Sequence, residues 1–588
     1  MMIVRRVQSA ARDLRSGLTG TRGRIRRRHG KEERMQQALI ALMIAVLAVT
    51  VLLPLIGLFS KAFYDKTGQF AGLENFVVYF TTPALLRSLL HTLNVSLLTT
   101  VISVGLAFLY AYALTRTDIK GRTLFRYIAL LPLFAPTMMH GIGLIYLFGN
   151  QGLVTTGLFG LLPAGLDIGL YGPVGIVLAE VAYTFPQAMM IMLVSLAVTD
   201  NRLYEAAETL GAGKWRTFLS VTLPSVKYGV ISALFVCFTM SFTDFGAPKI
   251  VGGNYNVLAT DIYKQVIGQQ NMTMGAAVGI LLTLPAVLAF AVDRFVERRQ
   301  KTLVSSKSVP YRIQKGSWRN AVFYVICSLI GGAILLLLGA VIFASVIKVW
   351  PYELSFTWNH FDFTSVAGEG LAPFWNSMQA ALYTALIGTA VTFVFAYLIE
   401  KVRHWHALRQ FAYFLSILPL ALPGMVIGLA FIFFFNRPDN PLSGIYGTIW
   451  IVVLANIVHF YAVPFITATA ALKKLDKEFE TVSESMRVPF YRTFARVTVP
   501  MSLPAVLEMF VYYFVNSMVT VSAVVFLYSA DFKLASVAIV NMDDAGDTAP
   551  AAAMSVLILL TNIVVRIGYE QLTKVLRNRA SAWQRNDF

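Results

Sequence analysis

The sequence WRTFLSVTLP at residues 215–224 returns in altered form as YRTFARVTVP at residues 491–500. The two copies are identical at six of ten positions and lie 276 residues apart. Both are polar segments between long apolar runs, so hydrophobic composition alone does not produce the repeat. A chain that duplicates one polar segment is expected to present the same surface twice, which suits a partner with two-fold symmetry.

The runs that flank the repeat have the length and composition of membrane-spanning helices. Of the 588 residues, 57% are hydrophobic and only 14% are charged, and runs of roughly 20 apolar residues can cross a bilayer. We therefore predict an all-α polytopic membrane protein with about twelve transmembrane helices. The predicted spans are residues 38–60, 88–114, 124–148, 171–198, 227–247, 274–293, 321–347, 374–399, 410–436, 447–471, 505–528 and 550–569.

The formal net charge of +18 is distributed as a topology signal. Lys and Arg gather in every second connection, whereas residues 149–170 contain neither. By the positive-inside rule, this pattern predicts a multi-pass membrane protein with both termini in the cytosol. Residues 1–34 are expected to form a basic cytosolic tail that touches anionic lipid, and no nucleic acid is expected as a partner. The two cysteines, Cys237 and Cys327, offer neither a disulfide framework nor a metal site.

The repeat extends beyond the ten-residue segment. Leu258-Ala259 matches Leu534-Ala535 at the same offset of 276 residues. We therefore predict a first half at residues 35–295, a polar cytosolic linker at 296–320 and a second half at 321–588. Because each half contains six predicted spans and begins in the cytosol, the two halves are expected to be parallel and pseudo-symmetric.

The first copy predicts a knob outside the membrane, made of two short helices joined by a tight turn. Asp200 can cap the first helix, Gly211 can adopt the left-handed conformation that ends it, and Pro224 suits the first turn of the next spanning helix. Trp215 and Phe218 are the expected apolar anchors. The residues assigned to this knob are Glu205, Ala206, Ala207, Gly211, Lys214, Trp215, Arg216, Phe218 and Pro224.

The spacing Glu-Ala-Ala-x3-Gly-x9-Val-x-Leu-Pro at residues 205–224 resembles the signature of permeases from ATP-binding-cassette importers that depend on a binding protein. In that family, of type I architecture, the knob docks on a separate ATPase. The resemblance implies two partners, a homodimeric cytosolic ATP-binding subunit that binds ATP and magnesium, and a periplasmic substrate-binding protein. The chain is then a transport subunit without a cofactor or metal of its own. It is not an enzyme, because residues 208–215 lack the first Gly and the Ser/Thr of a phosphate-binding loop.

The second copy departs from this signature. Thr481 stands where the glutamate is expected, and Arg487 replaces the glycine. Without a glycine the turn is expected to differ, with Pro489 breaking the helix instead, and the two knobs are expected to couple unequally. The residues assigned to the second knob are Thr481, Arg487, Arg492, Phe494 and Pro500.

Longer stretches resemble one subgroup of the same family, the fused permeases assigned to 2-aminoethylphosphonate import. These stretches are LYGPVGIV (170–177), GGNYNVLATDIYKQVIGQQN (252–271), FAVDRFVERRQ (290–300) and VTVSAVVFLYSADFKLASVAIVNMDDAGD (519–547). The resemblance implies 2-aminoethylphosphonate as the solute. Ferric-iron permeases share the two-halved plan and are the nearest alternative. An ion-coupled secondary transporter is the rival from another class, but acidic residues in the middle of the predicted spans are few.

Polar side chains inside spans are costly in a bilayer, so they face the bundle interior or a pathway by default. The 276-residue offset superposes polar positions of the fifth span on those of the eleventh. They either line a solute pathway or hydrogen-bond to neighbouring helices. The candidate pathway residues are Ser241, Asp244, Asn516, Ser517 and Thr520. Glu180, His140, His459 and Glu508 are expected to be structural. Residues 541–547 are expected in an outer loop that contacts the binding protein.

Overall fold

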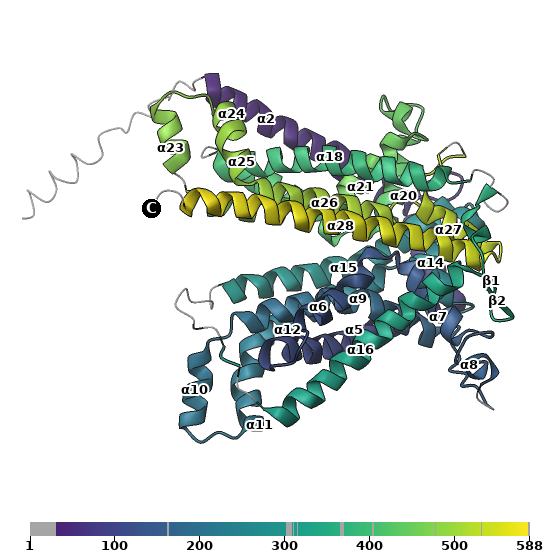
Figure 1. Ribbon diagram of the computed structural model, residues 1–588. Coiled ribbons are helices and arrows are strands. Elements are labelled where there is room, and N and C mark those ends of the chain that lie inside the picture. Colours follow the sequence, from purple (N-terminus) through teal and green to yellow (C-terminus); the bar gives the residue numbers. More distant parts are fainter. Residues whose placement is uncertain are drawn as a thin grey trace, which may run out of the picture.

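Two arms of helices, joined at one end and diverging toward the other, make up the protein (Figure 1). The computed structural model describes residues 31–585 except 162–163, 302–308, 310, 314–315, 365–369, 403–404, 477 and 531. The predicted basic tail lies outside the described residues except for its last four positions, which begin a helix. We call the end where the arms meet the closed end and the end where they diverge the open end.

The helices of the first half occupy one arm, apart from the opening ones. Their bounds are α2 Lys31–Leu47, α3 Leu53–Lys61, α4 Glu74–Thr81, α5 Pro83–Arg116, α6 Arg122–Leu130, α7 Thr137–Phe148, α8 Gly157–Gly160, α9 Pro173–Ala197, α10 Asn201–Thr209, α11 Lys214–Thr217, α12 Leu223–Thr243, α13 Gly246–Val251, α14 Leu258–Tyr263 and α15 Met272–Lys301. Short π-helical turns join α2 to α3 (Ala48–Leu52), α11 to α12 (Phe218–Thr222) and α14 to the loop before α15 (Lys264–Gly268), and a 3-10 turn (Leu131–Phe134) follows α6.

The second half follows the same order of elements. Their bounds are α16 Ser317–Ser345, β1 Ile347–Val349, β2 Glu353–Phe356, α18 Ala372–Lys401, α19 His406–Ile417, α20 Gly424–Phe435, α21 Ile449–Phe460, α22 Ala462–Lys474, α23 Glu478–Ser485, α24 Phe490–Thr493, α25 Val499–Met501, α26 Leu503–Val519, α27 Ala535–Asp544 and α28 Thr548–Arg585. A π-helical turn (Phe494–Thr498) links α24 to α25, and 3-10 turns occur at Asn359–Phe361, Leu418–Ala421 and Ser443–Ile445.

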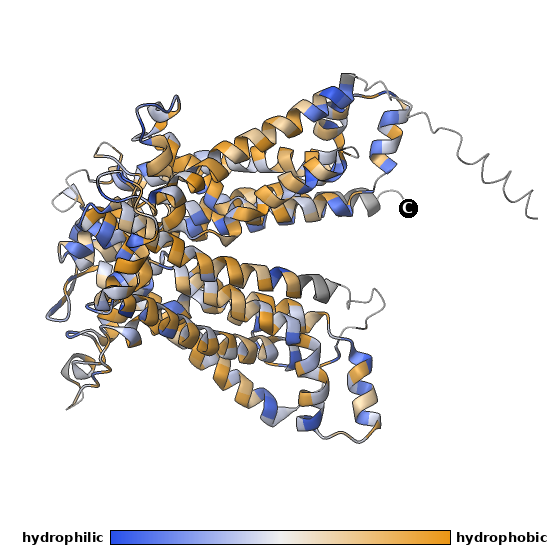
Figure 2. Ribbon diagram, turned by 180° about the vertical axis from the view of Figure 1, so that it is seen from behind, coloured by the Kyte–Doolittle hydropathy of each residue, from blue (hydrophilic) through white to orange (hydrophobic). Residues whose placement is uncertain are grey.

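The predicted fold class is confirmed. Eight helices in the described part of the chain are long and apolar enough to cross a membrane, or up to twelve if four bent pairs each count as one span. Hydrophobic residues follow the middle of both arms, and hydrophilic residues gather toward their ends (Figure 2). This distribution is what a bilayer requires, since apolar side chains face lipid and polar ones reach water.

Three predicted spans are not straight: 447–471 bends by 56° between Phe460 and Ala462, and 124–148 and 410–436 bend more sharply. The chain bends by 104° between Phe134 and Thr137 and by 113° between Ala421 and Gly424. Each of these two sharper bends is bracketed by two prolines, Pro132 and Pro136 in the first half, and Pro419 and Pro423 in the second. Proline lacks the N–H of the helical hydrogen bond and its ring clashes with the preceding turn, so the helix breaks.

The predicted span 505–528 is too long by nine residues, because α26 ends at Val519 and Thr520 is extended. The segment that joins the second short helix of the second half to α26 also differs from its counterpart in the first half. Residues 214–243 of the first half form one continuous span, whereas the equivalent segment bends by 77° between Met501 and Leu503. Pro504 explains the break, because the equivalent position in the first half is Tyr228.

The opening helix of each half packs in the arm of the other half (Figure 1). Helices α2 and α3 contact α18, α19 and α20, whereas α16 contacts α5, α6 and α7. The sequence boundaries of the two halves therefore do not coincide with the arms. The arms are tied together by two exchanged helices.

The closed end contains two elements that the sequence analysis did not predict. The strands β1 and β2 form an antiparallel hairpin between α16 and α18. Residues 541–544, expected in a loop, belong instead to the helix α27. Its Asp544 carboxylate accepts from the Lys249 ammonium of α13 at 2.7 Å, so an ion pair joins the two halves here.

Candidate functional site

The two predicted knobs lie at the open end, one on each arm (Figure 1). The first knob consists of α10 and α11, and the second knob of α23 and α24. In the first knob, the Asp200 carboxylate accepts from the Arg202 amide at 3.0 Å and so caps α10. The Asn201 side chain donates to the Glu205 carboxylate at 2.7 Å, which binds the predicted glutamate to its own helix.

The turns of the two knobs have the same backbone geometry. Gly211 has a φ of +72° and Arg487, at the equivalent position, has a φ of +54°. In the first knob the amide of Ala212 donates to Ala207 O at 2.9 Å, and in the second the amide of Val488 donates to Ser483 O at the same distance. The expectation that the second turn would differ is wrong, because Arg487 adopts the left-handed conformation itself at a cost in strain.

Pro489 does not break the helix of the second knob. It occupies the position of Gly213, and both residues precede the second short helix of their knob with an extended backbone. Proline suits this position because its φ is fixed near the observed −59° and no helical hydrogen bond is lost there. The second turn is further held by a hydrogen bond between the Ser483 and Thr493 hydroxyls.

An aromatic side chain anchors each knob to its arm. Phe218 packs against Phe108 and Tyr112 of α5, with ring centroids 6.0 and 6.2 Å apart. Phe494 packs against Phe393 and Tyr397 of α18, at 5.8 and 4.8 Å. The two anchors are equivalent in sequence and in contact. Each knob is therefore in direct contact with a long spanning helix.

Large apolar side chains project from both knobs into solvent at equivalent positions. Leu210 is 85% exposed and Met486 is 70% exposed, and Trp215 and Tyr491 are 72% and 50% exposed. Trp215 was expected to be an anchor, but it stacks on Phe218 at 5.6 Å and remains largely open. Exposed apolar groups of this size at two symmetric sites mark a surface for a protein partner.

The remaining predicted knob residues lie around these exposed side chains. Ala207 and Thr493 are buried within their knobs, whereas the charged residues reach solvent. The exposed members are Glu205, Ala206, Lys214, Arg216, Pro224, Thr481, Arg492 and Pro500. The surface of each knob is thus an apolar centre with a polar rim.

The predicted pathway residues occupy equivalent places at the ends of α12 and α26. Asp244 and Thr520 directly follow their helices with nearly the same backbone angles. The Asp244 carboxylate accepts from the Ala247 amide at 2.9 Å. Asn516 donates to Tyr512 O of its own helix at 2.7 Å, whereas the buried Ser241 and Ser517 hydroxyls have no hydrogen-bond partner among the described residues.

Glu180 was expected to be structural, yet it belongs to the same polar group. Its carboxyl group is fully buried and lies beside the Asp244 carboxyl group. Tyr183, one turn further along α9, lies within electrostatic range of both acids and of Tyr512 in the other half. The equivalent of Glu180 in the second half is Asn456, so only the first half supplies paired carboxyls.

Other in-span residues have simpler surroundings. His140 faces the Tyr183 ring with centroids 6.5 Å apart, and His459 lies against Phe460. Glu508 pairs with Arg566 at 3.3 Å. Over the residues that the structure describes, no three His, Cys, Asp or Glu side chains gather into a group that could hold a metal ion.

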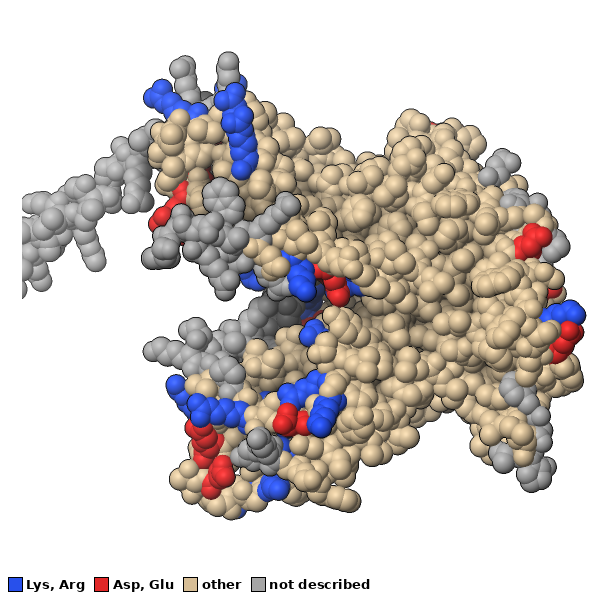
Figure 3. Space-filling view, in the orientation of Figure 1, with Lys and Arg blue, Asp and Glu red and all other residues tan. Residues whose placement is uncertain are grey.

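A cleft separates the arms at the open end, with Lys and Arg on both walls (Figure 3). It contains a cavity of about 610 Å³ lined by α5, α6 and α9 on one side and by α28 on the other. Arg122, Arg126, Arg566 and Glu570 are its charged residues. The cavity therefore lies between the two halves, and its charged lining contains both ion-paired and further arginines.

Comparison with known proteins identifies the family. The family described as "Binding-protein-dependent transport system inner membrane component" matches residues 101–302 and again 393–578, which is most of the chain. The chain belongs to this family. Each match contains one knob and one set of pathway residues, so the chain is a fusion of two permease units.

Two curated permeases illustrate the relationship. The ferric transport system permease protein FbpB of Actinobacillus pleuropneumoniae is 27% identical over 540 residues, covering 90% of this chain and 77% of its own length. The Fe(3+)-transport system permease protein FbpB 2 of Haemophilus influenzae is 24% identical over 504 residues, covering 84% and 92%. A crystal structure of a bacterial ABC transporter that imports alginate aligns with 47% of this chain and 98% of its own at a TM-score of 0.40 and 20% identity.

Membership in the family settles the class of the protein but not the role of single residues. The family is a transport component and not an ATPase, so the permease needs a separate source of energy. The sequence analysis missed Leu210 and Met486, although both directly precede the turn residue of their knob. An apolar residue at that place in an otherwise polar segment was the available signal.

Proposed function

We propose that this permease is the membrane-spanning subunit of an ATP-driven importer in the bacterial inner membrane, with both termini and both knobs in the cytosol. The observation that carries the proposal is the pair of knobs with the same turn, the same aromatic anchor and the same exposed apolar centre. Two equal surfaces at one end of the molecule suit a homodimeric partner. Family membership supports the same reading.

The proposed partners divide the work of transport. A homodimeric cytosolic subunit binds ATP and magnesium and docks one copy on each knob. A periplasmic binding protein delivers the solute at the closed end, where α13 and α27 meet. Closure of the ATP-binding subunits moves the knobs, and the anchors Phe218 and Phe494 carry this movement to α5 and α18. The open cleft on the knob side represents the inward-facing stage of this cycle.

Ferric iron is one candidate solute. The two curated relatives are named for ferric or Fe(3+) transport, and both match most of this chain. The group formed by Glu180, Asp244 and Tyr183 adds a second carboxyl and a phenol to the pathway. Oxygen donors of this kind suit a hard cation.

2-Aminoethylphosphonate is the second candidate, and the cavity favours it. Of its three arginines, Arg122 pairs with Asp118 and Arg566 pairs with Glu508 and Glu570, whereas Arg126 supplies a positive charge that would attract an anionic phosphonate. The second half contributes neutral donors, Asn516, Ser517 and Thr520, which suit a zwitterion. The stretches at 252–271 and 519–547 support the same solute through their resemblance to the phosphonate subgroup.

Uptake measurements separate the two candidates. Cells that carry the permease with its ATP-binding and binding-protein partners are compared with a deletion of this gene, using labelled ferric iron and labelled 2-aminoethylphosphonate. Glu180→Gln is expected to reduce iron uptake, and Arg126→Ala is expected to reduce phosphonate uptake. Loss of one uptake only, on deletion, identifies the solute. Unchanged uptake of both contradicts both candidates.

A further inference from the structure

A segment of the linker between the halves is bound to the first knob. The Asn201 amide donates to Val309 O at 2.9 Å, and the Val309 amide donates to the Asp200 carboxylate at 3.3 Å. The Arg312 amide donates to the Asn201 side-chain oxygen at 3.0 Å. The residues that cap α10 therefore also hold the linker. All three hydrogen bonds join the start of α10 to the linker.

A buried arginine that contacts two aromatic rings lies next to this junction. The Arg116 guanidinium, on the last residue of α5, is 4.1 Å from the ring centre of Tyr311 in the linker and 5.4 Å from that of Tyr204 in α10. The two rings meet edge to face, with centroids 4.8 Å apart. Arg116 is only 2% exposed and donates to Leu196 O at 2.8 Å. The guanidinium therefore lies over the Tyr311 ring and beside Tyr204, and a cation held over an aromatic face away from water is attracted to it.

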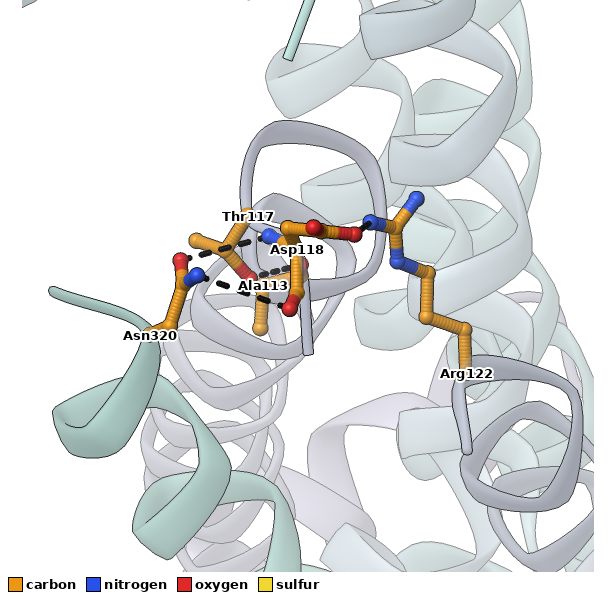
Figure 4. Close-up of polar contacts among 5 residues, drawn as sticks. All are labelled: Ala113, Thr117, Asp118, Arg122 and Asn320. Atoms are coloured by element: carbon orange, nitrogen blue, oxygen red, sulfur yellow. Dashed lines mark hydrogen bonds and ion pairs between the residues drawn. The ribbon is translucent and has the colours of Figure 1, made fainter. Parts of the chain in front are cut away.

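The far end of the linker is fixed as well (Figure 4). The Asp118 amide, in the turn after α5, donates to the Asn320 side-chain oxygen at 3.2 Å, and Asn320 lies in the first turn of α16. Asp118 in turn pairs with Arg122 at 2.6 Å. The linker thus connects α10, the end of α5 and the start of α16, which is the helix exchanged from the other half.

The second knob is fixed in a different way. Lys401, the last residue of α18, takes the place of Arg116, and Glu480 takes the place of Tyr204. Their side chains form an ion pair at 3.0 Å, and Lys401 also donates to Leu475 O. This pair connects α18 to α23 directly. In the described structure, the junction of the second knob contains no segment from between the halves.

We propose that the linker is a brace that sets the orientation of the first knob, and that Tyr311 and Arg116 are its positioning residues. The inference rests on the proposed docking role of the knob. Within its own arm α10 is held by the short connection to α9 and by a hydrogen bond between the Tyr204 and Thr222 hydroxyls at 3.1 Å. The contact of Arg116 with Tyr204 and Tyr311 and the three hydrogen bonds to the linker add the support that sets its tilt against α5. The two ATP-binding subunits then receive knobs that are held by different means, one by the linker and one by an ion pair.

The test compares Tyr311→Ala with Tyr311→Phe in the full transporter reconstituted into lipid vesicles. Phenylalanine keeps the ring that faces Arg116 and serves as the matched control. Amide hydrogen exchange of residues 201–209 is measured together with solute transported per ATP hydrolysed. We expect Tyr311→Ala to speed exchange in α10 about fivefold and to lower transport per ATP, with exchange in α23 unchanged. Tyr311→Phe is expected to behave as the wild type.

Each outcome has a separate meaning. Unchanged exchange in α10 of Tyr311→Ala contradicts the brace itself. Faster exchange with unchanged transport per ATP contradicts its role in positioning the knob. A Leu210→Asp variant in the same preparation tests the docking role independently, since Leu210 is exposed and makes none of the three hydrogen bonds to the linker. Wild-type transport by Leu210→Asp would contradict the proposed function and leave the exchange result valid.

Discussion

The two knobs reach the same backbone shape from different residues. Gly211 adopts its left-handed φ without strain, and a Cβ added there would meet nothing within 4 Å. Arg487 holds the equivalent conformation although its side chain disfavours it. The pattern of hydrogen bonds between the short helix and the turn is the same in both knobs. The shape is thus set by how the helix ends, and the residue at the turn sets only its energetic cost.

The helices that follow the two knobs have similar sequences but different shapes. The aromatic anchor and the first proline are present in both halves, as Phe218 and Pro224 and as Phe494 and Pro500. Residues 214–243 nevertheless form one continuous helix, whereas the equivalent segment of the second half is bent by 77°. One additional proline, Pro504, accounts for the difference. Similar knobs are therefore attached to the two arms through helices of different shape. We expect unequal coupling of the two knobs to the ATPase to come from these helices and not from the turns.

The largest effect is expected from Gly211→Val. A β-branched residue at a φ of +72° is strained, at a cost of about 1–3 kcal/mol, so the turn of the first knob should open. We expect uptake to be abolished in cells while the permease remains inserted. Gly213→Val is the matched control, because Gly213 has a φ of −63° and open space around it. Equal uptake by both variants at equal expression would contradict the assigned role of the turn.

Transfer of the proline to the first half should have the next largest effect. Tyr228→Pro places the break of the second half into the continuous helix, which costs about 3 kcal/mol in a helix interior. We expect a large loss of transport in reconstituted vesicles and a lower melting temperature. Pro504→Ala is the reciprocal variant and should cost much less stability. Equal behaviour of the two variants would mean that the bend is not caused by proline.

Matched substitutions at the exposed centres of the knobs should have intermediate effects. Leu210→Asp and Met486→Asp each place a charge where an apolar side chain is expected to enter the ATPase surface. We expect both to weaken binding of the ATP-binding subunit in a pull-down assay, with the more exposed Leu210 the more sensitive. Glu208→Gln, on the same helix, is the control. Unchanged binding in both Asp variants would contradict the assignment of these exposed side chains to the docking surface.

The smallest effect is expected from exchanging the turn residues. Arg487→Gly relieves a left-handed non-glycine residue and should stabilise the permease by about 1 kcal/mol. Gly211→Ala should destabilise it by a similar amount. Thermal unfolding in detergent measures both shifts. Shifts of the same sign would show that the two turns are not energetically comparable.

Much of this structure could be predicted from the sequence because a bilayer imposes simple rules. Span number, the two-fold repeat and the positions of the knobs follow from apolar runs and from one duplicated segment. The exchange of α2 and α16 between the arms could not be predicted, since either arm would bury an apolar helix equally well. The turn at Arg487 was missed because residue preference was given more weight than the helix end.

The candidate site shows the same limits. Phe218 and Phe494 were found because the repeat preserves them, whereas Glu180 was missed because its equivalent is Asn456. A symmetry argument detects what both halves share. It does not detect a group that only one half supplies, and the buried neighbours of such a group become known only when the helices are packed.

The central claim is that both knobs dock on a paired ATPase at once. Cysteines introduced as Leu210→Cys and Met486→Cys, singly and together, test this directly by cross-linking to the ATP-binding subunit. The native Cys237 and Cys327 are buried and should react little. The account predicts a cross-link from each single variant and, from the double variant, one permease joined to two ATP-binding subunits. Cross-linking from one knob only, or from neither, would contradict it.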